Sequence, residues 1–291
     1  MAIRVGTSSW TDPGFIRHWY PKGLSAAERL AYYAERFDCV ELNASFYGLP
    51  AERQAELWAE RTPEPFLFDI KLHRYLSHHA TPPDALPSDL RKQCEVDSEG
   101  HVVRDPDLEH ELSRRLGAAV APLASHGKLG MFLLQLTPGF SPRRHDLTEL
   151  DVVLDALEPV AVEFRNRHWL EGERRQEVIA YLRDRGAIFV AVDAPHGDHF
   201  MIMPPVDVIT NPGLAYLRCH GRNLDGYLRG RTVAERFDYD YSREEVEEIA
   251  DRARVMADEA EEVHVMFNNN ARDYAPKAAR RMLQALGQAP E

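Results

Sequence analysis

Short apolar runs recur eight times along the chain, and most of them turn polar at alternate positions near their C-terminal ends. Their first halves alternate little between apolar and polar residues, which is typical of parallel strands that are covered on both faces. The pattern predicts eight strands, at Ile3–Ser9, Cys39–Ser45, Pro65–His73, Lys128–Leu136, Val160–Arg165, Ala187–Asp193, Leu214–His220 and Val263–Asn268.

Helical periodicity fills most of the intervals between these runs. Ser25 with Glu28 and Ser242 with Glu245 have the spacing of capping boxes, and Gly186 is placed to end a helix. The interval between the sixth and seventh runs has no helical pattern. Helices are expected at Ser25–Phe37, Pro50–Arg61, Asp107–Ser125, Leu147–Leu157, Arg174–Arg185, Ser242–Glu261 and Pro276–Leu286.

Alternating strands and helices with right-handed crossovers predict a parallel sheet. Eight repeats favour closure into a (β/α)8 barrel of the TIM type, forming a single domain over residues 1–291. An open doubly wound sheet is the alternative, but the first strand is followed by Gly6–Trp10, which lacks a glycine-rich phosphate turn. Two long loops, Arg74–Pro106 and Gly221–Tyr241, follow strands three and seven, on the face where barrels carry active sites.

The strand ends carry the candidate chemistry. Glu163 and Arg165 have the same parity, so both side chains point to one side of the fifth strand. Burying either charge without a partner costs several kcal/mol, which a chain tolerates where chemistry requires it. The same reasoning predicts that one cavity collects the polar residues at the strand ends, namely Glu41, Asn43, Ser45, Asp69, Lys71, His73, Gln135, Asp193, Tyr216, Arg218, His220, Asn268, Asn269 and Asn270.

The amino-acid composition limits the kinds of molecule that the chain is expected to bind and the compartment in which it is expected to work. Lysines and arginines number 35 and acidic residues 47, which gives a net charge of −12. Such a chain repels polyphosphates at long range, so broad nucleic-acid binding is disfavoured. No apolar run approaches the length of a membrane span. Three cysteines without a CxxC pair and an N-terminus without a signal-peptide pattern favour a reducing, cytoplasmic location.

Several motifs resemble one known family. They are Gly6-Thr-Ser-Ser-Trp10, Trp19-Tyr-Pro21, Val40-Glu-Leu-Asn-Ala-Ser-Phe-Tyr47, Gln135-Leu-Thr-Pro138, Val162-Glu-Phe-Arg165 with Trp169, Leu217-Arg-Cys-His-Gly-Arg222 and Phe267-Asn-Asn269. In this order they resemble the YecE-like family of unknown function. The resemblance implies a TIM-type barrel and no established activity; kinship with xylose isomerase and endonuclease IV barrels is a fold-level analogy. The chain departs from the family at Asn270, where a histidine often stands, and in the histidine-rich segment His73–His79.

The residue types at the predicted mouth suit acid/base chemistry on an anion. Glu163 is the expected proton carrier, with Glu41 or Asp193 as a second carboxylate, while Lys71 and His220 complete the catalytic set. Substrate contacts are expected from Trp10, Asn43, Tyr47, His73, Gln135, Arg165, Trp169, Arg218, Arg222, Asn268 and Asn269. Two structural alternatives remain open: a Glu163–Arg165 ion pair that stabilises the barrel, and a polar layer whose charges neutralise one another.

No cofactor and no metal site are predicted. Glu41, Glu163, Asp193 and His220 are ligand types, so a divalent ion is the alternative, but the interspersed cations would repel it. His78 and His79 lie in a loop, where surface histidines are common.

Three functions are compatible with the sequence. The first is an enzyme, a hydrolase or isomerase, that acts on a small polar substrate with a phosphate or carboxylate group. Arg222, Arg229 and Arg231 follow strand seven, where barrels often bind phosphate. The alternatives are nucleic-acid processing of the endonuclease IV kind and a protein that binds a ligand or partner without catalysis.

Overall fold

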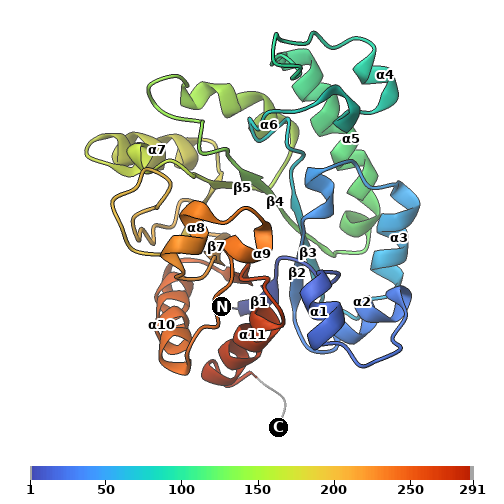
Figure 1. Ribbon diagram of the computed structural model, residues 1–291, viewed down its shortest axis with the longest axis vertical. Helices are drawn as coiled ribbons and strands as arrows, with labels where there is room; N and C mark the ends of the chain where they lie inside the picture. The colour runs from blue at the N-terminus through green and yellow to red at the C-terminus, as the bar shows by residue number, and fades with distance from the viewer. Residues whose placement is uncertain (1, 289–291) are drawn as a thin grey trace.

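The computed structural model describes residues 2–288 and contains a closed barrel of eight parallel strands, in which every strand pairs with its neighbours in sequence and β1 pairs with β8. Helices surround the strands (Figure 1). The predicted (β/α)8 barrel is therefore confirmed. The strands are β1 (Ala2–Thr7), β2 (Cys39–Leu42), β3 (Leu67–Lys71), β4 (Leu129–Gln135), β5 (Val160–Glu163), β6 (Ile188–Asp193), β7 (Leu214–Cys219) and β8 (Glu262–Phe267).

The longer helices form where apolar periodicity and capping signals coincide. The side chains of Ser25 and Ser242 each accept a hydrogen bond from the backbone N–H of the glutamate three residues later. The side chain of that glutamate in turn accepts a hydrogen bond from the backbone N–H of the serine. Both predicted capping boxes are therefore confirmed. The longer helices are α2 (Ala26–Ala34), α3 (Glu52–Glu60), α5 (Pro106–Ser125), α7 (Arg174–Asp184), α10 (Arg243–Glu259) and α11 (Tyr274–Ala285).

Some boundaries differ from those expected. The helix expected from Pro50 begins at Glu52, because Ala51 is extended and serves as its N-cap. The interval expected to be one helix at Leu147–Leu157 is a 3-10 turn, η3 (Leu147–Leu150), followed by α6 (Asp151–Ala156). None of the described helices is long and apolar enough to cross a membrane.

Shorter elements occupy the loops. Four short helices were not predicted: α1 (Pro13–His18), α4 (Ser88–Arg91), α8 (Leu224–Arg229) and α9 (Val233–Arg236). Three 3-10 turns, η1 (Ala44–Phe46), η2 (Pro83–Ala85) and η4 (Arg167–Leu170), accompany them. The predicted long loop after β3 carries η2 and α4 before α5 begins, and the one after β7 carries α8 and α9 before α10. Both segments follow the carboxyl ends of strands, where they can cover the mouth of the barrel.

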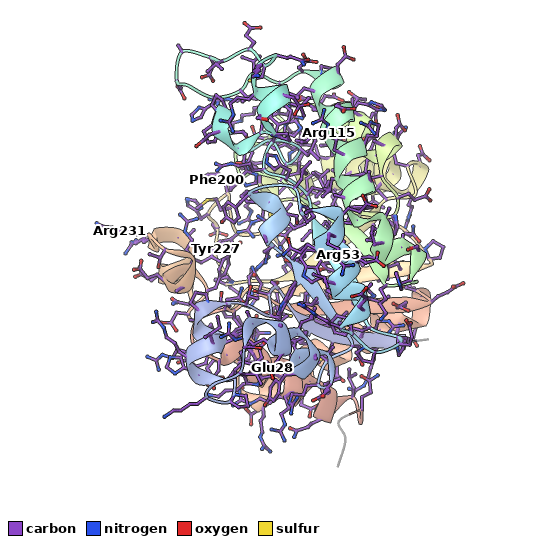
Figure 2. All side chains as sticks on the ribbon, turned by 90° about the vertical axis from the view of Figure 1, so that its right-hand side faces the viewer. Glu28, Arg53, Arg115, Phe200, Tyr227 and Arg231 are labelled. Atoms are coloured by element: carbon purple, nitrogen blue, oxygen red, sulfur yellow. The ribbon has the colours of Figure 1, made fainter. Side chains whose placement is uncertain are left out.

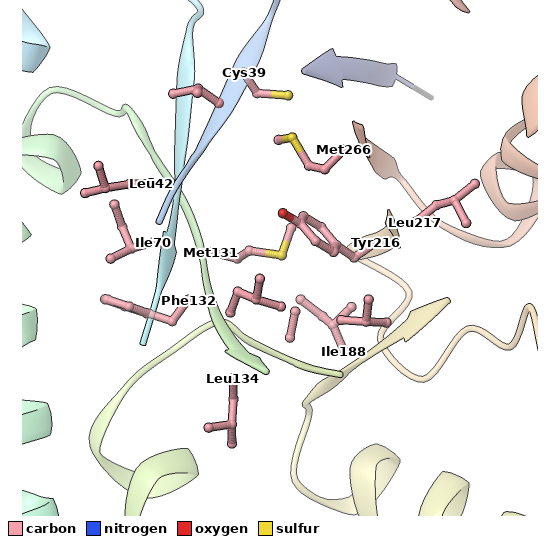
Figure 3. Close-up of a cluster of buried hydrophobic side chains, with 14 of the residues drawn as sticks. Cys39, Leu42, Ile70, Met131, Phe132, Leu134, Ile188, Tyr216, Leu217 and Met266 are labelled. Atoms are coloured by element: carbon pink, nitrogen blue, oxygen red, sulfur yellow. The ribbon is translucent and has the colours of Figure 1, made fainter. Parts of the chain in front are cut away.

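The interior of the barrel is filled with side chains rather than open. Met131 and Tyr216 are fully buried and lie within the ring of strands (Figure 3). Nearer the amino ends, His264 lies between two carboxylates, with Nδ1 at 2.9 Å from Asp69 and Nε2 at 2.7 Å from Glu262. Burial disfavours the charged imidazole, but the two carboxylates outweigh it and raise the pKa of His264 to about 9.

Candidate active site

A buried guanidinium organises the upper part of the barrel. Arg218, near the end of β7, is fully buried, and it donates to both oxygens of Glu41 from Nε and Nη2, at 2.9 and 2.7 Å. Its Nη1 donates to Glu163 and, at 2.9 Å, to Gln135. Tyr216 donates its hydroxyl to Glu41 at 2.8 Å. Strands β2, β4, β5 and β7 thus meet in one network, in which the side chains of Arg218, Glu41 and Glu163 are fully buried and every partner holds the others in place.

Strand parity predicted one cationic partner for Glu163, Arg165, and the structure adds a second, Arg218. Besides Arg218, it accepts from Arg165 Nη1 at 2.9 Å and lies 3.1 Å from Nε2 of His220. Burial alone would raise the pKa of this carboxyl, but the Arg218 charge, with His220 and Arg165, holds the pKa well below its usual range. Glu163 is therefore a carboxylate at all ordinary pH values.

His220 has a defined tautomer in this arrangement. Its Nδ1 lies 3.0 Å from the side-chain amide nitrogen of Asn268, which can only donate, so Nδ1 accepts and Nε2 carries the proton toward Glu163. Burial lowers the pKa of His220 to about 4, against the attraction of Glu163. The imidazole is neutral near neutral pH, and it orients the carboxylate.

Lys71 belongs to this network and, like Arg165, reaches the space above it. Its ammonium donates to Oε1 of Gln135 at 3.2 Å and lies 4.7 Å from the centre of the Phe46 ring. Burial, and then the charge of Arg218, lower the pKa of Lys71 to about 8. A substantial fraction of this amine is neutral at slightly alkaline pH, as a general base requires.

A cavity of about 720 Å³ opens directly above these groups. Its size lies within the range of small-molecule sites. Lys71, Arg165 and Arg236 line it together with one carboxylate, Asp12, so it is locally cationic in an acidic chain. Most of the remaining lining is polar or aromatic and includes Ser8, Ser9, Asn43, Phe46, Tyr47, His79, Gln135, Tyr227, Phe237, Asn268 and Asn270, while Pro13, Ala44, Pro138, Met201 and Leu228 add aliphatic surface.

Six residues that line this cavity each carry a buried polar atom without a hydrogen-bond partner among the described residues. The atoms are Ser8 Oγ, Asn43 Oδ1, His79 Nδ1, Arg165 Nε, Tyr227 Oη and Asn270 Oδ1. Buried polar groups are almost always paired, and exceptions call for an explanation. Both donors and acceptors are among these atoms, and their residues line one cavity, as expected for a pocket that completes its hydrogen bonding with a polar ligand.

The structure divides the predicted site residues into two levels. Six of them, Asn43, Tyr47, Lys71, Gln135, Arg165 and Asn268, line the cavity. Four others, Glu41, Glu163, Arg218 and His220, form the buried network that joins Gln135, Arg165 and Asn268 from below.

Asp193 and Arg222 lie elsewhere. Asp193 accepts hydrogen bonds from Arg222, from Tyr241 and from Arg252 of α10. Arg222 continues this ion cluster to Glu248 at 2.9 Å. Strand parity predicts that Asp193 faces the cavity, but its partners belong to the segment after β7 and to a surrounding helix. The two residues connect β6 to that outer layer.

Four further predicted contacts are packing residues. Trp10 is buried against Trp58 and Phe68, and Trp169 stacks on Phe140 and donates to its carbonyl at 2.9 Å. His73 is buried, with Nε2 3.1 Å from the carbonyl of Ala85. Asn269 donates to Tyr239 O at 2.8 Å. None of these four residues is among those that line the cavity.

The loop after β7 supplies two residues, Tyr227 and Arg236, that were not among the predicted site residues. Tyr227 of α8 covers Arg165, with the guanidinium carbon 5.2 Å from its ring centre. Arg236 of α9 lines the cavity, whereas the expected anion-binding residues Arg229 and Arg231 are exposed, and Arg231 points outward (Figure 2). No periodic pattern distinguishes Arg236 from its neighbours, so only the three-dimensional course of the loop identifies it.

The network and the cavity define a (β/α)8-barrel protein with a polar, cation-lined pocket at the carboxyl end of the barrel. The chain belongs to the family described as protein of unknown function DUF72, which matches residues 4–291. The resemblance noted in the sequence motifs is thereby confirmed.

Relatives span most of the chain. UPF0759 protein YunF of Bacillus subtilis (strain 168) is 27% identical over 290 residues, covering 98% of this chain and 94% of YunF. UPF0759 protein YecE of Escherichia coli (strain K12) is 29% identical over 196 residues, covering 66% and 59%. A crystal structure of a DUF72 family protein from Enterococcus faecalis V583 superposes with a TM-score of 0.80 at 26% identity, covering 99% of this chain and 97% of that one. Another, from Thermotoga maritima MSB8, gives 0.77 at 26% identity, covering 99% and 100%.

Proposed function

We propose that this protein is an enzyme that carries out acid/base chemistry, hydrolysis or isomerisation, on a small anionic substrate with hydroxyl groups. The observation that carries the proposal is the position of Lys71 beside Arg165 on a cavity whose buried polar atoms lack partners. A phosphorylated or carboxylated sugar-like molecule would complement both features. Its anion would bind the cations, and its hydroxyl groups would bind Asn43, Asn270 and Tyr227.

Lys71 is the proposed proton carrier. As the neutral amine it takes a proton from the substrate or from an attacking water, and as the ammonium it returns a proton to the leaving or rearranged group. Gln135 Oε1 holds the amine in place and is itself held by Arg218. The low pKa lets both forms of Lys71 coexist near pH 8.

Glu163 is proposed to position rather than to transfer protons. Its carboxylate is occupied by Arg218, Arg165 and His220, and its low pKa removes the protonated form from the working pH range. This geometry favours the structural alternative for the Glu163–Arg165 pair. The pair leaves Arg165 Nε free to bind the anion.

The mouth is proposed to work with protein groups alone. Glu41 and Glu163 each bind Arg218, and Lys71 and Arg165 stand beside them. Positive charges so close would repel a divalent ion at this position. We place the activity in the cytoplasm, since three free thiols suit a reducing compartment.

The test is a search for turnover with a matched pair of lysine variants. A panel of phosphorylated and carboxylated sugars is first screened for an increase in the melting temperature, and the compounds that bind are then assayed for conversion. Lys71→Met is expected to lower kcat at least roughly 100-fold, as loss of a general acid/base does. Lys92→Met, a change of an exposed lysine, is the control and should leave kcat unchanged.

Two outcomes would overturn the proposal. Conversion that Lys71→Met leaves intact would remove Lys71 from the chemistry. Compounds that raise the melting temperature but are never converted would identify a ligand-binding protein without catalysis.

A further inference from the structure

A second cluster of chemically competent side chains lies beside the mouth and outside its cavity. His78 belongs to the segment after β3, while His145 and Glu149 belong to the segment between β4 and α6. Their ligand-type atoms lie within 4.8 Å of one another. Among residues 2–288, no other group of three or more His, Cys, Asp or Glu side chains was found at such spacing.

The distances suit a small tetrahedral ion. His145 Nδ1 lies 2.9 Å from Glu149 Oε2, and His78 Nδ1 lies 3.8 Å from the same oxygen. Zinc binds histidine nitrogen and carboxylate oxygen at 2.0–2.2 Å, which places neighbouring ligand atoms about 3.4 Å apart. The two observed distances straddle this value, and each lies within about 0.5 Å of it.

His78 is the part of the cluster that protein contacts leave unexplained. Its side chain is only 2% exposed, and neither Nδ1 nor Nε2 has a hydrogen-bond partner among the described residues. An imidazole buried in this way forfeits both of its hydrogen bonds. Its backbone has a φ of 60°, a conformation that a non-glycine residue adopts at a cost of about 1–3 kcal/mol. The chain thus maintains a strained residue whose ring nitrogens have no hydrogen-bond partner within residues 2–288.

We propose that His78, His145 and Glu149 bind a divalent transition metal ion of the zinc type. His78 and His145 supply one imidazole nitrogen each, and Glu149 supplies Oε2 while its Oε1 still accepts from the backbone N–H of Asp146. A water completes the coordination on the accessible side, where Glu149 is 38% exposed. Two imidazoles with one carboxylate are a ligand set that zinc favours.

The surroundings fix both histidine rings for this role. Phe140 stacks on His145 at a centroid distance of 4.8 Å, and its ring meets His78 edge to face at 4.7 Å. Arg104 is a cation whose charge acts on both His78 and Glu149. It is paired with Glu109, which offsets its repulsion of a dication.

A metal ion here would join two mouth segments. The segments already share a hydrogen bond from Thr137 N to Ser77 O at 3.1 Å. His79, the neighbour of His78, lines the mouth cavity, so occupancy at the metal site would restrict one wall of the pocket. The role is structural and does not depend on the proposed enzymatic function.

The experiment measures metal binding by the full-length protein after chelation and dialysis. Co2+ is titrated while its visible absorption is recorded, and Zn2+ is then added in competition. The variants are His145→Gln, which changes a partly exposed side chain, and His78→Gln. His168→Gln is the matched control, because His168 also lies 2.9 Å from a glutamate, Glu171, but has no second histidine beside it.

The proposal expects one Co2+ per chain with the strong absorption of a four- or five-coordinate ion, displaced by one equivalent of Zn2+. His145→Gln should weaken binding at least roughly tenfold, the minimum cost of losing a metal-site group, and His168→Gln should bind as the natural chain does. Zn2+ should raise the melting temperature of the natural chain and of His168→Gln only. Absence of saturable binding, or equal binding by folded His145→Gln, would overturn the proposal.

Discussion

At the scale of single residues, the charges of this barrel are stabilised by multiple partners. Arg218 offsets Glu41 and Glu163, and neutral His220 orients Glu163 from the other side. His264 shows the opposite protonation, because two carboxylates face its ring nitrogens. Similar degrees of burial thus produce one histidine with a low pKa and one with a high pKa, and the neighbours decide the direction.

The raised pKa of His264 makes stability depend on pH. Because its pKa is about 9 in the folded chain and ordinarily about 6.5, its contribution is fully present below pH 6.5 and is lost as the pH rises through 9. We expect the free energy of unfolding to fall by about 1 kcal/mol per pH unit from pH 6.5 to 8. The lowered pKa of Lys71 has the opposite effect, because it makes stability rise with pH, but only above about pH 8. The interval from pH 6.5 to 8 therefore reports on His264.

Urea unfolding at several pH values measures this effect. His264→Gln should remove the slope, whereas His110→Gln, an exposed change on α5, should keep it. An unchanged slope in His264→Gln would show that other groups cause the pH dependence.

Some of the contacts between single residues could be predicted from the sequence and others could not. Strand parity correctly placed Glu41, Glu163 and Arg218 together, because alternate side chains of neighbouring strands must share one interior. The same reasoning misplaced Asp193, because its partner Arg252 lies on a surrounding helix. Strand parity relates only side chains on strands that share the interior, so it carries no signal for a partner outside the ring of strands.

At the scale of elements, the positions of strands and long helices followed from the sequence because burial of apolar side chains sets their periods. The short helices α1, α4, α8 and α9 were missed, because segments of four to six residues carry too few repeats to establish a period. Three of these helices contribute to the mouth cavity, where α1 supplies Pro13, α8 supplies Tyr227 and α9 supplies Arg236. The unpredicted part of the fold is thus also the part that completes the site.

One strand position illustrates how closely the elements pack. A Cβ atom on Gly130 of β4 would lie 2.3 Å from Asp69 Oδ1 and 3.2 Å from the His264 ring. Gly130→Ala should therefore destabilise the protein by about 2–3 kcal/mol, as overpacking of a rigid core does. Gly48→Ala, where a Cβ would meet nothing within 4 Å, is the control.

Denaturant unfolding of the two alanine variants provides the comparison. Gly130→Ala should show a lower midpoint with an unchanged m-value, and Gly48→Ala should differ little from the natural chain. Equal midpoints would mean that β3 and β8 can move apart to accommodate the methyl group.

At the scale of the whole molecule, charge is distributed unevenly. The chain carries a net charge of −12, yet three cations and one carboxylate line the mouth cavity. A small anion can enter such a pocket, while the acidic exterior repels a long polyanion. This distribution favours a small anionic ligand over nucleic acid and agrees with the orphaned hydrogen-bonding groups in the cavity.

The central claim is that Lys71 has a lowered pKa and meets an anion in this cavity. The chain contains five lysines, so nuclear magnetic resonance of isotopically labelled lysine side chains can follow each of them as the pH changes. The account predicts one resonance that titrates near pH 8, is absent from Lys71→Met, and titrates at higher pH when inorganic phosphate is added. A Lys71 resonance that titrates near 10.5, or one that does not respond to phosphate, would contradict it.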